Sequence, residues 1–157
     1  MKKIFIVFSL VMIAFGASAQ KQGLSSIGLS MGYGFDTENA TLGIDYRYSI
    51  TDEFRFAPSL THYVKKDGLS AWSIDMNAHY VVLLSNQFAF YPIGGLSLSF
   101  WDFKWNDNTT YTRFGANIGL GGEVYATPEL TVGLDLKYHI IKDFDQALFA
   151  VRVAYNF

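Results

Sequence analysis

The sequence predicts an all-β protein, an eight-stranded antiparallel transmembrane up-and-down β-barrel. Apolar residues alternate with small or polar residues in eight separate runs, and a period of two is typical of strands whose two faces meet different environments. Charged residues make up 17% of the chain, against about 25% in an average soluble domain. No run reaches the roughly 18 consecutive apolar residues of a membrane helix.

The first segment differs from the rest. Residues 1–19 carry the features of a secretory signal peptide: Lys2 and Lys3, a short apolar run, and the small-residue motif Ala17-Ser18-Ala19. An uncleaved membrane anchor is the alternative, but the apolar run is short for a span. We therefore expect a cleaved export signal, followed by one barrel domain over residues 20–157.

Each of the eight runs places Leu, Ile, Val, Phe or Tyr on one face and mostly Gly, Ser, Ala, Thr or Asn on the other. The predicted strands are 27–35, 42–50, 54–62, 72–82, 88–101, 113–124, 130–140 and 147–157. The connections after even-numbered strands are short, and those after odd-numbered strands include the longer or more polar pieces. This contrast is typical of periplasmic turns and outer loops. Pro58 and Pro92 cannot donate to the strand ladder, so we expect a bulge at each.

The volume of the apolar face indicates which way it points. An eight-stranded lumen is only just wide enough for side chains to fill it, so the many bulky apolar residues do not fit inside. The apolar faces carry no Asp, Glu, Lys or Arg, as expected where Arg or Lys at the bilayer midplane costs about 2–4 kcal/mol. Aromatic residues near the strand ends predict two interfacial girdles, with Tyr125 in the lower and Trp101 in the upper. A soluble lipocalin-like barrel is the alternative.

Charged side chains gather on the small-residue face, which the prediction places in the lumen. The candidate lumen network consists of Asp45, Arg47, Arg55, Asp75, Arg113, Glu123, Asp135, Lys137 and Arg152. We expect these charges to pair and plug the lumen, with Asp135 opposite Arg152 on neighbouring strands. The alternative interpretation is the selectivity constriction of a pore. The plug is favoured because an unpaired buried charge is costly and the lumen is narrow.

The last strand ends on an aromatic residue, and one of its faces consists of Phe149, Val151, Val153, Tyr155 and Phe157. With the export signal and the eight strands, it makes residues 24–157 resemble the small outer-membrane barrels of the OmpX and OmpA type. The resemblance implies a multi-pass monomer in the outer membrane of a Gram-negative bacterium, in contact with outer-membrane lipid and lipopolysaccharide. It also implies insertion by the outer-membrane barrel assembly machinery, for which the last strand would be the assembly signal.

The expected role is structural or one of surface interaction. A small channel is the principal alternative and a lipid A-modifying enzyme a distant one. The segment 101–110 reads as the longest outer loop, and Trp101, Phe103 and Trp105 are its candidate contact residues. Their alternative role is to extend the upper aromatic girdle.

Nothing in the sequence predicts a catalytic residue, a metal site or a cofactor. We place His62 at the outer interface, His139 in the lumen near the rim and His79 in the lower lumen. No His-x-Ser motif or paired ligand spacing accompanies them. The chain has no cysteine, and its net charge of −2 without a basic patch gives no reason to expect nucleic acid as a partner.

Overall fold

A computed structural model describes residues 23–104 and 108–157, and the predicted signal peptide, residues 1–19, lies outside them. The strands are β1 (Ser25–Gly34), β2 (Asn39–Ser49), β3 (Phe54–Lys66), β4 (Leu69–Tyr80), β5 (Val82–Leu83), β6 (Phe88–Lys104), β7 (Asn108–Tyr125), β8 (Leu130–Ile141) and β9 (Gln146–Asn156). Both β4 and β5 pair with β6, so together they form one interrupted strand. The predicted eight-stranded barrel is confirmed.

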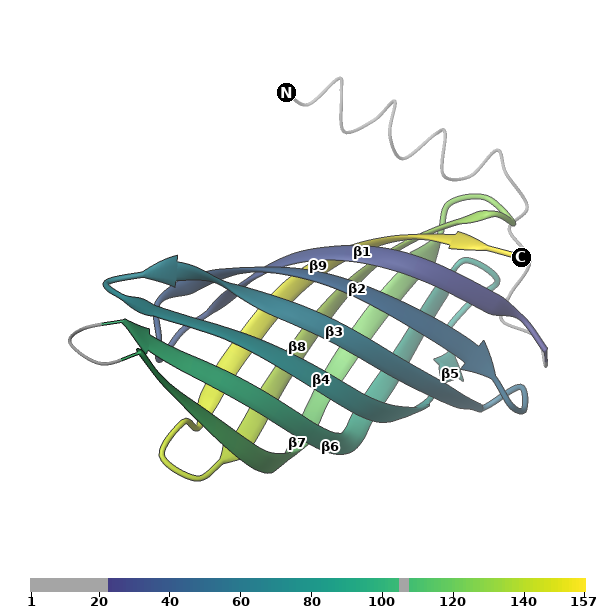
Figure 1. Ribbon diagram of the computed structural model, residues 1–157. Coiled ribbons are helices and arrows are strands. Elements are labelled where there is room, and N and C mark those ends of the chain that lie inside the picture. Colours follow the sequence, from purple (N-terminus) through teal and green to yellow (C-terminus); the bar gives the residue numbers. More distant parts are fainter. Residues whose placement is uncertain (1–22, 105–107) are drawn as a thin grey trace, which may run out of the picture.

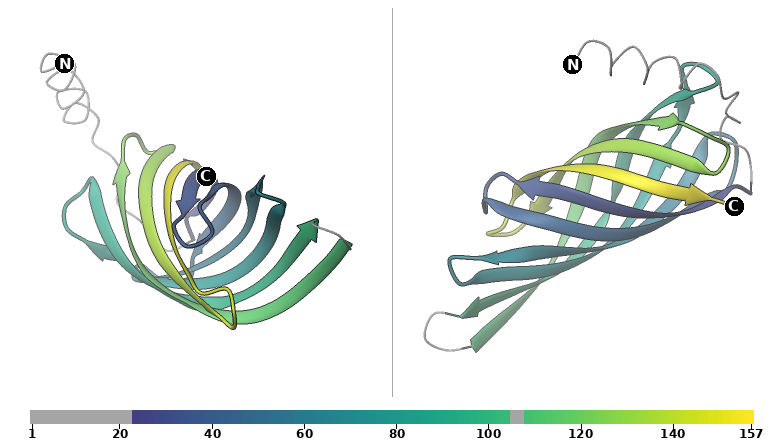
Figure 2. Two further views of the ribbon diagram at one scale, coloured as in Figure 1. Left: turned by 90° about the vertical axis from the view of Figure 1, so that its left-hand side faces the viewer. Right: turned by 90° about the horizontal axis from the view of Figure 1, so that it is seen from above.

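The strands wind round a central lumen, as Figures 1 and 2 show. With β4 and β5 counted as one strand, each strand pairs antiparallel with its neighbour in sequence, and β1 pairs with β9, so the sheet has no free long edge. Ser25 and Phe157 are joined by two backbone hydrogen bonds at the end that we call the inner end. Within the described residues, no helix is long and apolar enough to cross a membrane.

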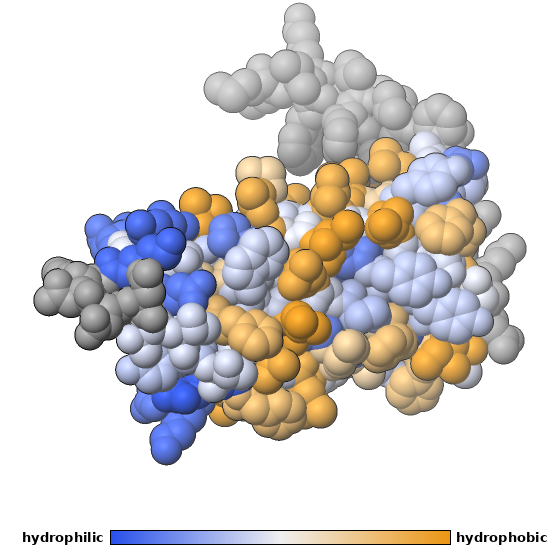
Figure 3. Space-filling view, viewed as in Figure 1, coloured by the Kyte–Doolittle hydropathy of each residue, from blue (hydrophilic) through white to orange (hydrophobic). Residues whose placement is uncertain are grey.

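The two faces of the sheet separate as the alternation predicts. Outward residues are apolar and exposed; for example, Leu29 and Met31 are 67% and 68% exposed. Inward residues are small, polar or charged and mostly buried. Figure 3 shows an apolar belt across the near face, with hydrophilic side chains gathered at the left-hand end, where the β3–β4 and β6–β7 hairpins lie. We call this the outer end.

The two prolines within strands interrupt pairing without producing the bulges that we predicted. The register of β2 against β3 is the same on both sides of Pro58, and that of β6 against β7 runs unchanged through Pro92. The pairing of β6 with β4 stops at His79 and resumes in β5 at Val82, opposite the stretch that contains Pro92. A proline removes one backbone donor, which breaks a ladder without adding a residue.

Three turns at the inner end share one design. Thr51, Ser85 and Thr127 each occupy the second position of a four-residue turn. Each hydroxyl accepts a hydrogen bond from the backbone N–H three residues later, at 2.9, 3.2 and 3.0 Å. In all three, Glu or Gln follows two residues after the hydroxyl and an apolar strand residue comes next. The repeated local hydrogen bond explains why each hairpin reverses at the same point.

The connections at the outer end are not longer than the inner turns where the structure describes them, contrary to our prediction. Asp67 and Gly68 form a two-residue turn between β3 and β4, with φ angles of 50° and 84°. Tight hairpin turns with positive φ at both positions favour Asp-Gly. β6 and β7 extend to Lys104 and from Asn108, so much of the predicted loop 101–110 is strand.

Candidate functional site: the lumen of the barrel

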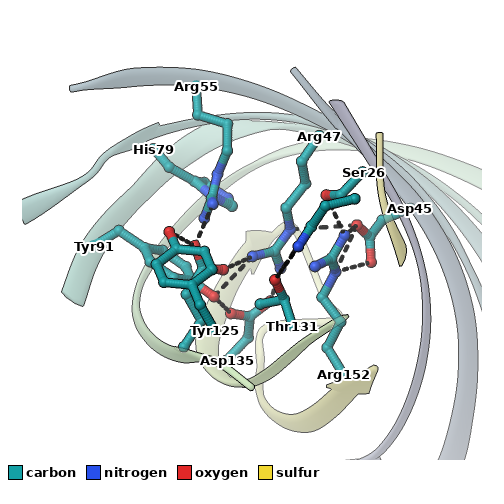
Figure 4. Close-up of polar contacts among 12 residues, drawn as sticks. Ser26, Asp45, Arg47, Arg55, His79, Tyr91, Tyr125, Thr131, Asp135 and Arg152 are labelled. Atoms are coloured by element: carbon teal, nitrogen blue, oxygen red, sulfur yellow. Dashed lines mark hydrogen bonds and ion pairs between the residues drawn. The ribbon is translucent and has the colours of Figure 1, made fainter. Parts of the chain in front are cut away.

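Eight charged side chains project into the lumen from six different strands. Four are basic and four are acidic, and all are buried or nearly so. They are Arg47, Arg55, Lys137 and Arg152, and Asp45, Asp75, Glu123 and Asp135. Figure 4 shows several of these side chains converging from opposite walls. Among the described residues, the formal charges of this lumen network therefore cancel.

Arg47, on β2, lies at the centre of the network. Its Nε is 3.3 Å from Asp45 Oδ1, and its Nη1 is 3.2 Å from Glu123 Oε2. Its Nη2 donates to Asp135 Oδ2 at 2.7 Å. Tyr91 closes the ring, because its hydroxyl accepts from Arg47 at 2.8 Å and donates to Asp135 at 2.6 Å. The planar guanidinium, with five donors, thus connects β2 to β6, β7 and β8.

A second centre forms around Glu123, on β7. Its Oε1 accepts from Arg55 Nη1 at 2.5 Å and from the Tyr125 hydroxyl at 2.7 Å. The Arg55 guanidinium also contacts His79 Nδ1 at 3.0 Å and lies 4.6 Å from the centre of the Tyr91 ring. The His79 ring stacks on Tyr91 at 4.7 Å. The contact of Arg55 with Glu123 crosses the lumen from β3 to β7, whereas His79 and Tyr91 lie on the paired strands β4 and β6.

Arg152, on β9, pairs with Asp45 on β2, so the predicted pair with Asp135 is wrong. Its Nη2 is 2.7 Å from Asp45 Oδ1, and its Nε donates to the same carboxylate at 2.8 Å. The guanidinium reaches Asp45 by passing over β1 at Gly28, where a Cβ would lie 2.5 Å from Arg152 Nε. Asp135 lies opposite Ala150 in the β8–β9 register. The missing side chain on β1 therefore allows a pair that spans two strands.

Polar contacts continue toward the outer end above the central network. Lys137 Nζ donates to Asp75 Oδ2 at 3.2 Å, and the Ser97 hydroxyl donates to the other oxygen at 2.6 Å. A cavity of about 30 Å³ borders this region and is lined in part by Thr41 and Thr61. A polar cavity of this size has room for about two water molecules. The mid-lumen is therefore largely filled by side chains.

Arg113 was predicted to join the lumen network, but it lies at the outer rim. Its side chain is partly exposed, and its Nη2 lies 3.9 Å from Asp143 Oδ2. At the same rim, Lys66 donates to Glu38 at 2.6 Å. This hydrogen bond lowers the pKa of the Glu38 carboxyl and raises the pKa of the Lys66 ammonium group. The rim pairs are solvated and separate from the buried network.

The outer end of the lumen is closed by a buried apolar group that we call the aromatic cap. It consists of the buried residues Tyr63, Trp101 and Leu148 together with Phe144, which is partly buried and packs against them. The Trp101 ring stacks on Phe144 at 4.6 Å and lies 5.5 Å from the Tyr63 ring. Its indole N–H donates to Ser99 Oγ at 2.9 Å. Phe144 comes from the β8–β9 connection, so this connection covers the mouth of the barrel.

The cap corrects the placement of Trp101, which is 1% exposed. We predicted it in the upper girdle or among loop contact residues, but it shares the inward face with Ser97 and Ser99. Phe103 packs against the cap and is partly buried, while Trp105 lies outside the described residues. The strand continues past Trp101, and period-two alternation therefore keeps its side chain inside.

Two tyrosines near the inner end are part of the lumen rather than of the lipid interface. Tyr125 was predicted in the lower girdle, but it has the same parity as Glu123 and is buried beside it. Sequence reasoning missed Tyr91 because Pro92 blurred the alternation of its strand. The parity from Ser97 back to Tyr91 was the available signal, since the register of β6 against β7 is continuous.

The three histidines lie where we expected. His62 faces outward, with its ring 4.3 Å from Trp72 and its Nδ1 3.2 Å from the Ala71 carbonyl oxygen. His79 and His139 are buried in the lumen. Within the described part of the chain, no group of three potential ligands is arranged to hold a metal ion.

Four of the candidate assembly residues lie on the outward face of β9, which pairs with β1 and β8, and the fifth, Phe157, directly follows the strand. All five side chains are exposed on the apolar belt: Phe149, Val151, Val153, Tyr155 and Phe157. Their position leaves them available to the surroundings of the barrel.

A closed antiparallel barrel with an apolar exterior and a polar interior defines a membrane-spanning β-barrel. Residues 7–157 match the family model of the outer membrane protein beta-barrel domain. The chain belongs to this family and is therefore an outer-membrane barrel. No curated protein matches the sequence.

Solved structures share the fold at low sequence identity. The N-terminal β-barrel domain of Pseudomonas aeruginosa OprF has a TM-score of 0.77 at 20% identity, covering 88% of this chain and 100% of that one. Ail, the attachment invasion locus protein of Yersinia pestis, has a TM-score of 0.65 at 15% identity, with coverage of 87% and 99%. OprG of Pseudomonas aeruginosa has a TM-score of 0.66 at 10% identity, with coverage of 91% and 99%.

Proposed function

We propose that this protein is a closed outer-membrane barrel with a structural or surface-interaction role, and that its lumen does not conduct. The observation that carries the proposal is the balance of the lumen network. Four buried cations meet four carboxylates at 2.5–3.3 Å. A selectivity constriction uses charges that a passing ion can contact, whereas here each charge has a fixed partner. The aromatic cap closes the lumen a second time.

A small channel is the second candidate, and the cavity beside Lys137 favours it. The cavity is about 30 Å³ and is lined by charged and hydroxyl-bearing residues, so it can hold water. Conduction would require the Arg47 contacts and the aromatic cap to open together. The closed barrel is the better proposal because breaking a buried ion pair costs about 3–5 kcal/mol.

Single-channel recording in a planar bilayer distinguishes these two functions. The mature protein is refolded in detergent, and its insertion is checked by the mobility shift of the folded barrel on gels. We expect no discrete current steps from the wild type. A double variant, Arg47→Ala with Trp101→Ala, removes one bulky group at each obstruction and should show steps. If the wild type does show current steps, and their size changes in Arg152→Ala, the lumen would instead be the selectivity filter of a channel.

Catalysis on lipid A finds no support at the outward histidine. The cross-strand neighbours of His62 are Leu42 and Trp72, which provide neither a nucleophile nor an acid.

We further propose that the outward face of β9 contacts the barrel assembly machinery, and that the apolar belt contacts outer-membrane lipid and lipopolysaccharide. Deletion of the outer hairpins, with folding preserved, tests whether they bind a partner.

A further inference from the structure

Neither the backbone conformation nor the packing around Gly122, on β7, requires a glycine at this position. Its φ is not positive, so any L-residue can adopt its backbone. A Cβ there would meet only the Ala89 carbonyl oxygen, at 3.8 Å. By contrast, a Cβ at Gly28 would collide with the Arg152 guanidinium. The glycine at 122 faces outward, and its effect is to leave a gap in the apolar belt.

The gap lies in an almost entirely apolar groove of about 550 Å³ on the outside of the barrel. Phe90 and Leu134 flank Gly122 directly in the β6–β7 and β7–β8 registers. The groove is completed by Phe88 on β6, Leu120 and Val124 on β7, and Val132 on β8. Its volume falls within the range of about 300–1,000 Å³ typical of small-molecule sites.

We propose that this groove binds one acyl chain of a phospholipid in the periplasmic leaflet. The chain belongs to the outer-membrane barrel family, so its outward face meets hydrocarbon. Gly122 is three residues from Tyr125, the end of β7 at the inner turns. With a rise of about 3.3 Å per residue and a strand tilt of about 40°, the groove lies about 8 Å from that end. This depth is within the leaflet on the side of the inner turns, because each leaflet contributes about 15 Å of hydrocarbon. Hydrophilic side chains gather at the opposite end of the barrel, which is typical of the extracellular end of such barrels, so we assign the inner turns to the periplasmic side.

The shape of the groove favours an acyl chain over a second copy of the barrel. The aromatic side chains of Phe88 and Phe90 stand on the β6 side, and the backbone of β7 at Gly121 and Gly122 forms part of the floor. A second barrel would present a rigid convex wall, whose side chains would have to match this hollow. A flexible acyl chain bends to fill the same space and recovers its dispersion contacts. The inference is independent of whether the lumen conducts.

Photo-crosslinking tests the proposal on the full mature protein. The protein is reconstituted in phosphatidylethanolamine vesicles containing a trace of the same lipid with a diazirine on one acyl chain. The variant Gly122→Leu fills the groove, and the matched control Gly94→Leu adds the same side chain at an outward glycine on β6. Gly94 also has open space around its Cβ position and does not line the groove. The labelled peptides are then mapped by mass spectrometry.

We expect labelling to concentrate on the peptides that contain Phe90 and Leu134. It should fall about tenfold in Gly122→Leu, as for a loss of about 1.4 kcal/mol in binding, and stay unchanged in Gly94→Leu. Even labelling around the barrel in all three proteins would overturn the proposal. So would crosslinks between copies that disappear in Gly122→Leu, since a second copy would then occupy the groove.

Native mass spectrometry of protein extracted from outer membranes identifies the source of the chain. A phospholipid mass retained by the wild type and Gly94→Leu, but lost from Gly122→Leu, supports the proposal. If lipid A instead is retained by the wild type and Gly94→Leu and lost from Gly122→Leu, the proposal is overturned, because the occupant would come from the other leaflet.

Discussion

Tyr91 shows how a single hydroxyl fixes the geometry of two charged groups. It accepts from Arg47 and donates to Asp135 at the same time. We predict that Tyr91→Phe lowers the free energy of unfolding by about 1–3 kcal/mol, because two charged groups each lose a hydrogen bond in a buried site. Urea unfolding in lipid vesicles measures this loss. The control Tyr80→Phe removes an outward hydroxyl and should stay within about 0.5 kcal/mol. Equal losses in the two variants would contradict a special role for Tyr91.

Gly28 is the residue over which Arg152 reaches Asp45. A methyl group at this position would lie 2.5 Å from the Arg152 Nε, so the guanidinium has to move. We predict that Gly28→Ala destabilises the barrel by about 1–3 kcal/mol through overpacking. Gly94→Ala, at an outward glycine with open space, serves as the control and should change stability by less than about 0.5 kcal/mol. The comparison uses the same urea titration, and an unchanged midpoint for Gly28→Ala would show that Arg152 has another path.

The wrong prediction that Arg152 pairs with Asp135 shows which facts about a single residue cannot be derived from the sequence. Alternation placed its side chain in the lumen correctly, because parity is a local property. Its partner, Asp45, lies 107 residues away in the chain. Choosing between Asp45 and Asp135 requires the stagger between strands and the space above Gly28. Neither can be read from a single sequence.

At the scale of the element, the inner turns are encoded locally and could have been recognised. The hydroxyls of Thr51, Ser85 and Thr127 accept equivalent backbone hydrogen bonds. We predict that Thr127→Val lowers the unfolding free energy by about 0.5–1.5 kcal/mol, because its size is retained and one hydrogen bond is lost. Thr112→Val, at an exposed position on β7, is the matched control. If both substitutions have the same effect, the turn hydroxyl contributes nothing specific.

The ends of strands were harder to predict than their centres. We ended the strand before the longest loop at Trp101, but β6 continues to Lys104 and pairs with β7 to its end. Polar residues such as Asp102 indicated a loop, whereas an extended hairpin above the membrane tolerates them. Because we ended the predicted strand too early, we assigned Trp101 to the lipid interface. Its parity with Ser99 placed it in the lumen, where it forms the aromatic cap.

At the scale of the whole molecule, the barrel has its polar groups inside and its apolar groups outside. Side-chain volume alone predicts this arrangement, since the bulky residues exceed what an eight-stranded lumen holds. The lumen is then stable only if its charges are paired, because the desolvation penalty of each ion is several kcal/mol. The balanced charges of the lumen network and the aromatic cap are thus two consequences of closing a narrow barrel. Both support the proposal that the lumen does not conduct.

Tryptophan quenching tests this inside-out arrangement directly. Trp72 faces outward and is 45% exposed, whereas Trp101 is 1% exposed inside the barrel. Two proteins are prepared that keep one of these tryptophans each, with the others, including Trp105, replaced by phenylalanine. In vesicles of phospholipid with brominated acyl chains, we expect strong quenching of Trp72 and little quenching of Trp101, because bromine quenches on contact. Unbrominated vesicles provide the reference intensity for each protein. Equal quenching of the two would mean that Trp101 meets the bilayer, and the aromatic cap would then have to be abandoned.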